Sequence, residues 1–276
     1  MKMKISLIST VLNEEKNIDF FIKSIINQSK KPDGFIIVDG GSTDKTYDIL
    51  KKFSKKYKWI KVFQKKGANI SRGRNIAIEK AKNDIIVTAD AGTRFRKTWL
   101  RNLVRGFNGV ASYGKNIAKT DDNEFQKLIA KKIMHDKACG SSRNMIFSKK
   151  IWKEVGGYPE DMIRGEDSLF DERIIRKGYK INMVKDAVGE WEMRLSLKEV
   201  KRQYYLYGYW DGIAYRRYKI VPLKTKIAVT GLTILLPLYP LGCILSMFSL
   251  SFKIDFIRRF AFLKGFIKGF FGLKLW

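Results

Sequence analysis

The chain has 276 residues, 45% of them hydrophobic, so it is long enough to bury a core and does not have the composition of a disordered protein. Lysine and arginine number 55 against 27 aspartates and glutamates, a formal net charge of +28. So large a surplus predicts a polyanionic partner: nucleic acid, anionic lipid or a phosphorylated substrate. Cys139 and Cys243 lie far apart without CxxC or Cys/His spacing, which argues against a disulfide framework or structural zinc and is typical of a reducing compartment.

Apolar periodicity predicts alternating strands and helices from the amino terminus to about residue 184. The predicted strands cover residues 5–11, 35–38, 60–63, 84–89, 110–114 and 181–184. The predicted helices cover residues 14–28, 43–57, 71–81, 97–107, 149–155 and 166–177. Alternation at this pace indicates βαβ units, and therefore an α/β fold with a mostly parallel sheet.

The first predicted strand superficially resembles a secretory signal peptide, because lysines precede an apolar run. Ser6, Ser9 and Thr10 interrupt that run, and Asn13-Glu14-Glu15 ends it. The stretch therefore fits a β-strand better, and we expect the bulk of the protein to stay in the cytoplasm.

A long stretch without charged residues covers residues 227–252, enough to cross a bilayer as a helix. Pro237 and Pro240 lie near its middle, and basic residues flank both of its sides, so the positive-inside rule gives no orientation. Two membrane geometries fit, a single kinked span and a re-entrant hairpin with both ends in the cytoplasm. A buried pair of core helices is the alternative outside a membrane.

The carboxyl terminus alternates aromatic and aliphatic residues with arginine and lysine from Phe256 to Phe271. This pattern is typical of a helix that lies in an anionic membrane interface. We therefore divide the chain into a first domain, residues 1–212, and a membrane-association segment, residues 213–276. The predicted location is the cell membrane, with the first domain on its cytoplasmic side.

Polar and acidic side chains form four short motifs along the chain. These motifs are Asn13-Glu14-Glu15, Val38-Asp39-Gly40-Gly41-Ser42-Thr43-Asp44, Asp90-Ala91-Gly92 and Gly165-Glu166-Asp167. Asp39 closes a predicted strand, and open α/β sheets bind ligands at the carboxyl ends of their strands. A plain turn with a helix cap explains Ser42 and Asp44, but it does not explain the other three motifs.

With these motifs, residues 5 to about 212 resemble a family 2 glycosyltransferase of the GT-A fold. The resemblance rests on their order together with Ser9-Thr10-Val11-Leu12, Arg74-Asn75 and Gly156-Gly157-Tyr158. Each motif is weak by itself, and the ordered set is what identifies the family. The resemblance implies transfer of a sugar from a nucleotide-sugar donor to an acceptor hydroxyl, with inversion at the anomeric carbon.

The resemblance also implies roles for single residues. Asp167 has the position of the catalytic base, and a carboxylate in a closing cleft is suited to take the acceptor proton. The structural alternative is that Glu166 and Asp167 merely begin a helix, where the macrodipole favours carboxylates. Asp39 is expected to contact the base or ribose of the donor, and Glu15 to share this task. The other expected donor-binding residues are Thr10, Asn13, Ser42, Arg74, Asp90 and Ala91.

Two positions depart from the family pattern and weaken an expected Mg²⁺ or Mn²⁺ site. Gly92 replaces the second carboxylate of an Asp-x-Asp motif, and Trp191 replaces a histidine that often follows the last strand. Asp90 and the diphosphate oxygens then provide few oxygen ligands for a hard divalent ion. Arginines of the adjoining loops are alternative cations for the leaving diphosphate, with surface solvation as their structural alternative: Arg72, Arg74, Arg94 and Arg96.

The predicted partners are a nucleotide-sugar donor, a glycan or lipid-linked acceptor and an anionic membrane surface. A Gln-x-x-Arg-Trp motif, which marks processive members of the family, is absent from the sequence, so transfer of a single sugar is favoured. A non-catalytic nucleotide-sugar-binding protein is the alternative function. A basic nucleic-acid-binding protein is a third, but no nucleic-acid-reading motif is present and no nucleic acid is expected. The oligomeric state is open.

Overall fold

The computed structural model describes residues 3–120, 123–133, 141–220, 225, 246 and 249–275. Contacts divide the chain into two compact units. The first comprises Met1–Lys119, Asp136–Asp161 and Arg173–Glu192. The second comprises Thr120–His135, Met162–Glu172 and Met193–Trp276.

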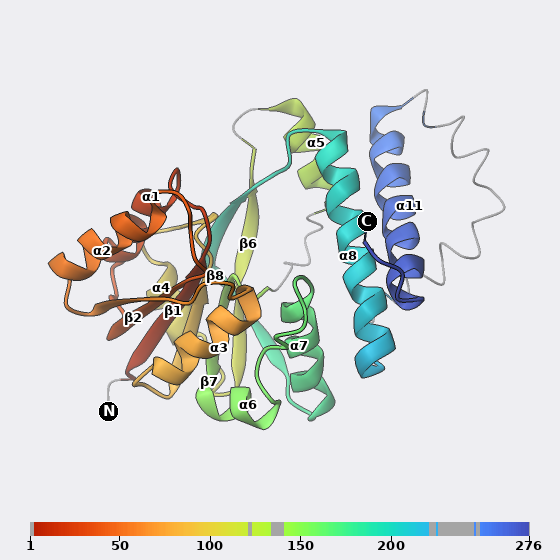
Figure 1. Cartoon of the computed structure of the whole chain (residues 1–276). Helices are drawn as coiled ribbons and strands as arrows, with labels where there is room; N and C mark the ends of the chain where they lie inside the picture. The colour runs from red at the N-terminus through yellow and green to blue at the C-terminus, as the bar shows by residue number, and fades with distance from the viewer. Residues whose placement is uncertain are drawn as a thin grey trace. The chain divides into compact units, whose positions relative to one another are not determined.

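The first unit is built on an eight-stranded sheet with the order β3-β2-β1-β4-β7-β6-β8-β5 (Figure 1). Strands β1 to β4 run parallel to one another, and β6 runs parallel to β8. Strand β7 is antiparallel to β4 and β6, and the short β5 is antiparallel to β8. The α/β fold with a mostly parallel sheet is therefore confirmed. The strands are β1 (Ile5–Val11), β2 (Gly34–Asp39), β3 (Ile60–Gln64), β4 (Ile85–Ala89), β5 (Thr93–Phe95), β6 (Ala111–Lys119), β7 (Asn144–Ser148) and β8 (Ile181–Glu192).

Helices cover both faces of this sheet (Figure 1). Alternate residues of β1 and β2, such as Leu7 and Ile37, are fully buried in the main core with the apolar residues of α1 (Ile18–Ile26) and α4 (Trp99–Arg105). The intervening residues face α3 (Ile70–Lys80), where Gly73 allows Thr10 to approach closely. The first unit also contains α2 (Thr46–Lys56) and α6 (Lys149–Glu154).

Two strands are longer than the sequence predicted. Strand β6 continues to Lys119 instead of ending at Gly114, and β8 continues to Glu192 instead of ending at Val184. Their register shifts between Gly114, which pairs with Val184, and Lys115, which pairs with Val188. The bulge leaves residues 185–187 unpaired with β6, and this interruption hid the continuing strand from a periodicity analysis. Strands β5 and β7 were not predicted either.

The second unit contains α5 (Glu124–Ile133), α8 (Leu197–Tyr218) and α11 (Leu250–Phe270). Helices α8 and α11 touch through glycines on both sides. A Cβ at Gly208 would overlap the carbonyl oxygen of Phe262, and a Cβ at Gly265 would overlap that of Tyr205. Gly212 and Gly269 repeat this contact one turn farther along each helix. The small residues let the two backbones approach one another directly.

Helix α7 (Glu166–Arg176) begins in the second unit, and its residues from Arg173 onward belong to the first. The uncharged stretch 227–252 lies outside the described residues except for Ser246 and 249–252, so the choice between span and hairpin lies outside them too. Among the helices that the structure describes, none combines the length and the apolar character that crossing a membrane requires. The division of the chain at residue 212 stays a prediction.

Replacing Gly208 with alanine tests the glycine contact between α8 and α11. Alanine raises helix propensity by about 1 kcal/mol in an isolated helix. Here the added methyl group must displace the α11 backbone, so we expect the free energy of unfolding to fall by about 1–3 kcal/mol. Urea unfolding of Gly208→Ala measures the change, and Gly34→Ala, whose new Cβ meets nothing within 4 Å, is the control. Equal stability of the two variants would contradict the packing described.

Candidate active site

The carboxyl ends of β1, β2 and β4 lie side by side, because β1 pairs with both neighbours in parallel register. The loops that follow these strands carry three of the predicted motifs, at residues 13–15, 39–44 and 90–92. The structure therefore brings these motifs to one edge of the sheet, where α/β proteins bind ligands.

Asp39 is fully buried at the end of β2, and its carboxylate organises the loop that follows. Its Oδ1 accepts hydrogen bonds from the backbone N–H groups of Gly41 and Ser42, both at 2.9 Å, and from Gln64 Nε2 at 3.0 Å. Its Oδ2 accepts the Ser42 hydroxyl at 2.5 Å. These four donors engage both oxygens of the carboxylate. The contact of Asp39 with a donor nucleotide stays a prediction. Gln64, at the exposed end of β3, was not selected from the sequence.

The loops after β1 and β2 are joined by reciprocal hydrogen bonds. Asn13 N–H donates to Ser42 Oγ at 2.9 Å, and Asn13 Oδ1 accepts Thr43 N–H at 2.9 Å. Glu15 N–H donates to Asp44 Oδ2 at 3.1 Å. Asn13 has a φ of 54°, in the left-handed region that asparagine tolerates better than most residues. Asn13, Glu15 and Ser42 thus build the loops, and their contacts with a donor stay predictions.

The buried Arg74 forms an ion pair with the half-buried Asp90, between α3 and the end of β4. Arg74 is 2% exposed, and its guanidinium donates to Asp90 Oδ1 at 2.9 Å. The guanidinium carbon also lies 5.2 Å from the ring centroid of Tyr158. The next residue, Asn75, accepts the Tyr158 N–H at 3.0 Å and donates to the Tyr158 carbonyl at 2.9 Å. The Arg74-Asn75 motif therefore fixes the Gly156-Gly157-Tyr158 motif against α3.

Asp90 is the only predicted metal ligand at this edge, and it already has a cationic partner. Glu14, half-buried in the loop after β1, belongs to a predicted motif but was given no role of its own from the sequence. Burial raises the pKa of the Glu14 carboxyl, a hydrogen bond from Asn17 opposes the rise, and the charges of Asp90 and Asp44 add to it. Among the described residues, no three acidic, histidine or cysteine side chains are grouped to hold an ion. The protein side chains alone do not form a divalent-metal site here.

Two of the four arginines predicted to neutralise the diphosphate, Arg72 and Arg94, are exposed and have weak partners. Arg74 is buried against Asp90, and Arg96 pairs with Glu190 at 3.2 Å. Arg72 approaches Glu160 at 4.0 Å, and Arg94 lies 5.0 Å from the ring centroid of Phe20. Such exposed pairs contribute little free energy, so both guanidinium groups can turn toward an anion. Their role at the diphosphate stays a prediction.

Arg143 is a further cation at this edge that sequence reasoning missed. Its carbonyl accepts the backbone N–H of Asp90 at 3.4 Å, which places it beside the end of β4. Its guanidinium carbon lies 4.3 Å from the ring centroid of Trp191, the residue found in place of the expected histidine. The Trp191 ring therefore supports a cation, a role that no spacing in the sequence indicated.

Asp167 lies in the first turn of α7, within the second unit. Its Oδ1 accepts the backbone N–H of Ser168 at 2.8 Å. The preceding Gly165 has a φ of 75°, a conformation that glycine adopts without strain, and the helix begins immediately after it. Glu166 is buried and Asp167 is half-buried. The role of Asp167 as base stays a prediction.

Comparison with known proteins agrees with this geometry. Residues 6–158 match the family model "Glycosyl transferase family 2". A Methanococcus voltae protein, dolichyl N-acetyl-α-D-glucosaminyl phosphate 3-β-D-2,3-diacetamido-2,3-dideoxy-β-D-glucuronosyltransferase, is 24% identical over 96% of this chain and 98% of its own length. The poly(ribitol-phosphate) β-glucosyltransferase of Bacillus spizizenii is 36% identical over 67% of this chain and 31% of its own length.

Solved structures share the fold. A mannosyltransferase from Pyrobaculum calidifontis in complex with GDP-Man and Mn²⁺ superposes with a TM-score of 0.69 at 16% sequence identity, covering 98% of this chain and 87% of that one. S. aureus TarS 1-349 in complex with UDP-GlcNAc gives a TM-score of 0.55 at 16% identity, covering 99% of this chain and 93% of that one.

Proposed function

The chain belongs to glycosyl transferase family 2 and is an inverting glycosyltransferase that uses a nucleotide-sugar donor, and we propose that it transfers a single sugar to a hydroxyl of a lipid-linked or cell-surface glycan intermediate. The absence of a Gln-x-x-Arg-Trp motif supports single transfer. The name of the Methanococcus voltae relative, which gives a dolichyl-linked sugar phosphate as its acceptor, supports the lipid-linked class.

The observation that carries the proposal is the edge of the sheet at the ends of β1, β2 and β4. The loops there are held together by Asp39 and Asn13, and Arg74 is buried beneath them beside Asp90. A preformed loop binds a nucleotide without losing further conformational freedom. Arg143, stacked on Trp191 beside the end of β4, is a further cation that supports stabilisation of a leaving diphosphate at this edge.

In the proposed reaction Asp167 takes the proton of the acceptor hydroxyl. The acceptor oxygen then forms a bond to the anomeric carbon as the bond to the diphosphate breaks, and the diphosphate leaves with the electron pair. A carboxylate at the start of α7 is favoured there by the helix dipole, and a carboxylate within reach of an acceptor hydroxyl can take its proton.

Asp167→Asn removes the proposed base while keeping the side chain's shape. We expect turnover to fall by about two to four powers of ten with nearly unchanged donor binding, the usual contribution of a positioned base. Steady-state transfer and nucleotide-sugar titration measure the two quantities, and Glu172→Gln on the same helix is the charge-matched control. Full activity of the Asn variant would remove Asp167 from the mechanism.

We further propose that this chain depends less on a divalent ion than an enzyme with two carboxylates at the Asp90 motif. Gly92 supplies no ligand, and Arg74 already neutralises Asp90. Arg72, Arg94 and Arg143 then supply part of the charge that stabilises the leaving diphosphate.

Turnover after exhaustive chelation tests the metal proposal. We expect a substantial fraction of the activity to persist, because the stabilising cations belong to the protein. The measurement compares chelated enzyme with enzyme supplied with Mg²⁺ or Mn²⁺, alongside Arg143→Gln and the control Arg202→Gln, an exposed arginine of α8. If chelation abolishes turnover and one equivalent of ion restores it, Asp90 and substrate oxygens suffice to hold a metal and the arginine proposal is wrong.

We also propose association with the cytoplasmic face of an anionic membrane through α11 and the residues after it. Phe271 and Leu273 are 67% and 56% exposed, and the adjoining Lys274 and, earlier in α11, Lys264 are exposed as well. Apolar residues interleaved with lysine are suited to insertion among anionic headgroups.

A double substitution, Phe271→Ser with Leu273→Ser, should weaken binding to phosphatidylglycerol vesicles by about tenfold or more, since each large apolar side chain gains about 1.5–3 kcal/mol on full burial. Co-sedimentation with vesicles measures the change. The control replaces Ile175 and Leu195, also exposed, with serine. Indifference of the unaltered protein to these vesicles would contradict the proposal.

A further inference from the structure

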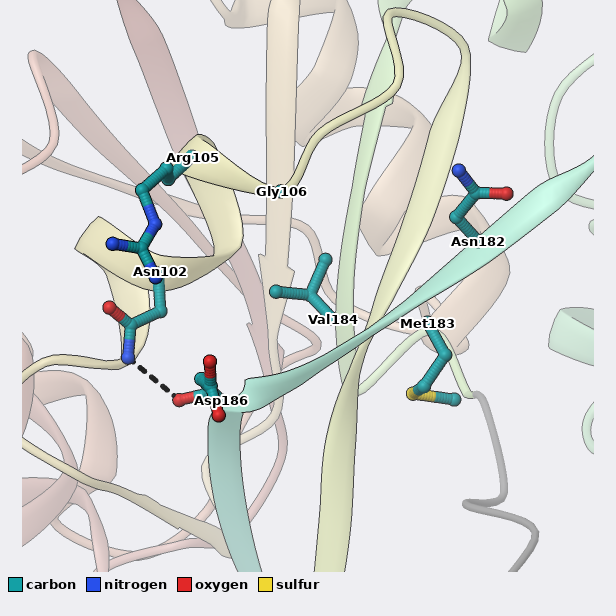
Figure 2. A pocket seen from close by; sticks show the side chains of 7 residues that line it. All are labelled: Asn102, Arg105, Gly106, Asn182, Met183, Val184 and Asp186. Atoms are coloured by element: carbon teal, nitrogen blue, oxygen red, sulfur yellow. Dashed lines mark hydrogen bonds between the residues drawn. The ribbon is translucent and has the colours of Figure 1, made fainter.

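A second charged hollow lies in the first unit, on the side of β6 and β8 that faces α4. It is a groove of about 660 Å³, and the basic side chains that line it are Arg96, Arg101, Arg105, Lys115 and Lys185. Asp186 is the one carboxylate in the lining. An adjoining cavity of about 370 Å³ shares Asn102, Arg105 and Asp186 with the groove (Figure 2). The candidate active site lies instead at the ends of β1, β2 and β4.

The groove is shaped by the bulge in β8. Pairing jumps from Val184 to Val188, so Lys185 and Asp186 protrude from the ladder. Asn102 of α4 donates to the Asp186 carbonyl at 2.8 Å, as Figure 2 shows. The buried Asn144 donates to the Ala187 carbonyl at 3.3 Å. Because asparagines from α4 and β7 bond the carbonyls of Asp186 and Ala187, the bulge is a fixed part of the fold, and Lys185 lines the groove together with residues of α4.

The positive charge of the groove is largely uncompensated. Arg96 pairs with Glu190 at 3.2 Å. The other four cations form no ion pair within the described residues: Arg101, Arg105, Lys115 and Lys185. Like charges gathered in a hollow repel one another and focus a positive potential, which an anion relieves on binding.

The chemistry of the lining selects phosphate among the possible anions. Guanidinium groups present paired N–H donors that match phosphate oxygens, and the lysines add point charges. The apolar part of the lining is aliphatic, Ile117 and Val188, so it offers no aromatic ring on which a nucleic-acid base could stack. The volume lies within the range of small-molecule sites.

We propose that this groove binds the phosphate groups of a phosphorylated acceptor, separately from the nucleotide-sugar site. This rests on the proposed function, in which the acceptor is a lipid-linked or cell-surface glycan intermediate. The groove then selects acceptors that carry phosphate over neutral glycans.

Calorimetric titration of the full-length protein with tripolyphosphate tests the groove without turnover, so its result is independent of whether the chain transfers sugar. The variant carries Arg101→Gln, Arg105→Gln and Lys185→Gln. The control removes the same charge elsewhere, with Lys52→Gln, Lys55→Gln and Lys58→Gln, all exposed. We expect the Kd to rise about tenfold or more in the groove variant and to stay within twofold in the control. The single variant Lys185→Gln, at the bulge, should raise the Kd about threefold. It replaces the triple variant in this test if the triple variant does not fold.

Equal Kd values in all three proteins would overturn the proposal, as would equal weakening in the variant and its control. A second arm uses phosphatidylglycerol vesicles, which the groove variant should bind as the unaltered protein does. Lost vesicle binding with unchanged tripolyphosphate binding would overturn the proposal and assign the groove to a membrane surface.

Discussion

The buried guanidinium of Arg74 sets the geometry of the candidate active site. A charge with 2% exposure is stable only when it is paired, and its partner is Asp90, at the end of the central strand β4. Arg74 reaches Asp90 because Gly73 lets α3 lie directly on β1. The pair consequently fixes the height of α3 above the sheet. The guanidinium of Arg74 thereby occupies one side of Asp90, the residue predicted as a metal ligand.

The loops after β1 and β2 are held by hydrogen bonds from neutral donor groups. Asp39 has no cationic partner among the described residues, and its carboxylate is satisfied by two backbone N–H groups, a hydroxyl and an amide. The loop it organises is thereby rigid before a ligand arrives, which lowers the entropy lost on binding. Asn13 extends this order to the loop after β1. The first unit thus presents a preformed surface, whose Arg72 and Arg94 side chains keep only weak partners.

The positive charges that give the net charge of +28 are isolated in some regions of the chain and clustered in others. Exposed lysines of α2 are solvated separately, whereas the bulge in β8 gathers cations from α4, β6 and β8 around one groove. In the second unit, basic residues of α11 are interleaved with exposed aromatic side chains. The proposals for nucleotide, phosphate and membrane each rest on a different cationic region of the chain.

The sequence by itself determined the α/β class, the family and the order of the motifs. Strands such as Ile5–Val11 and helices such as Ile70–Lys80 follow from local periodicity, which neighbouring residues suffice to set. It also indicated that Asp39 and Asp90 end strands.

Only the tertiary structure decided that Asp90 pairs with Arg74, that Asp39 is already satisfied, and that Arg143 stacks on Trp191. The continuation of β8 and its bulge were decided there too, because the asparagine contacts that hold residues 185–187 come from segments distant in sequence. Local pattern fixes which residues form a strand, whereas the partner of a buried polar group depends on which segments the folded sheet places beside it.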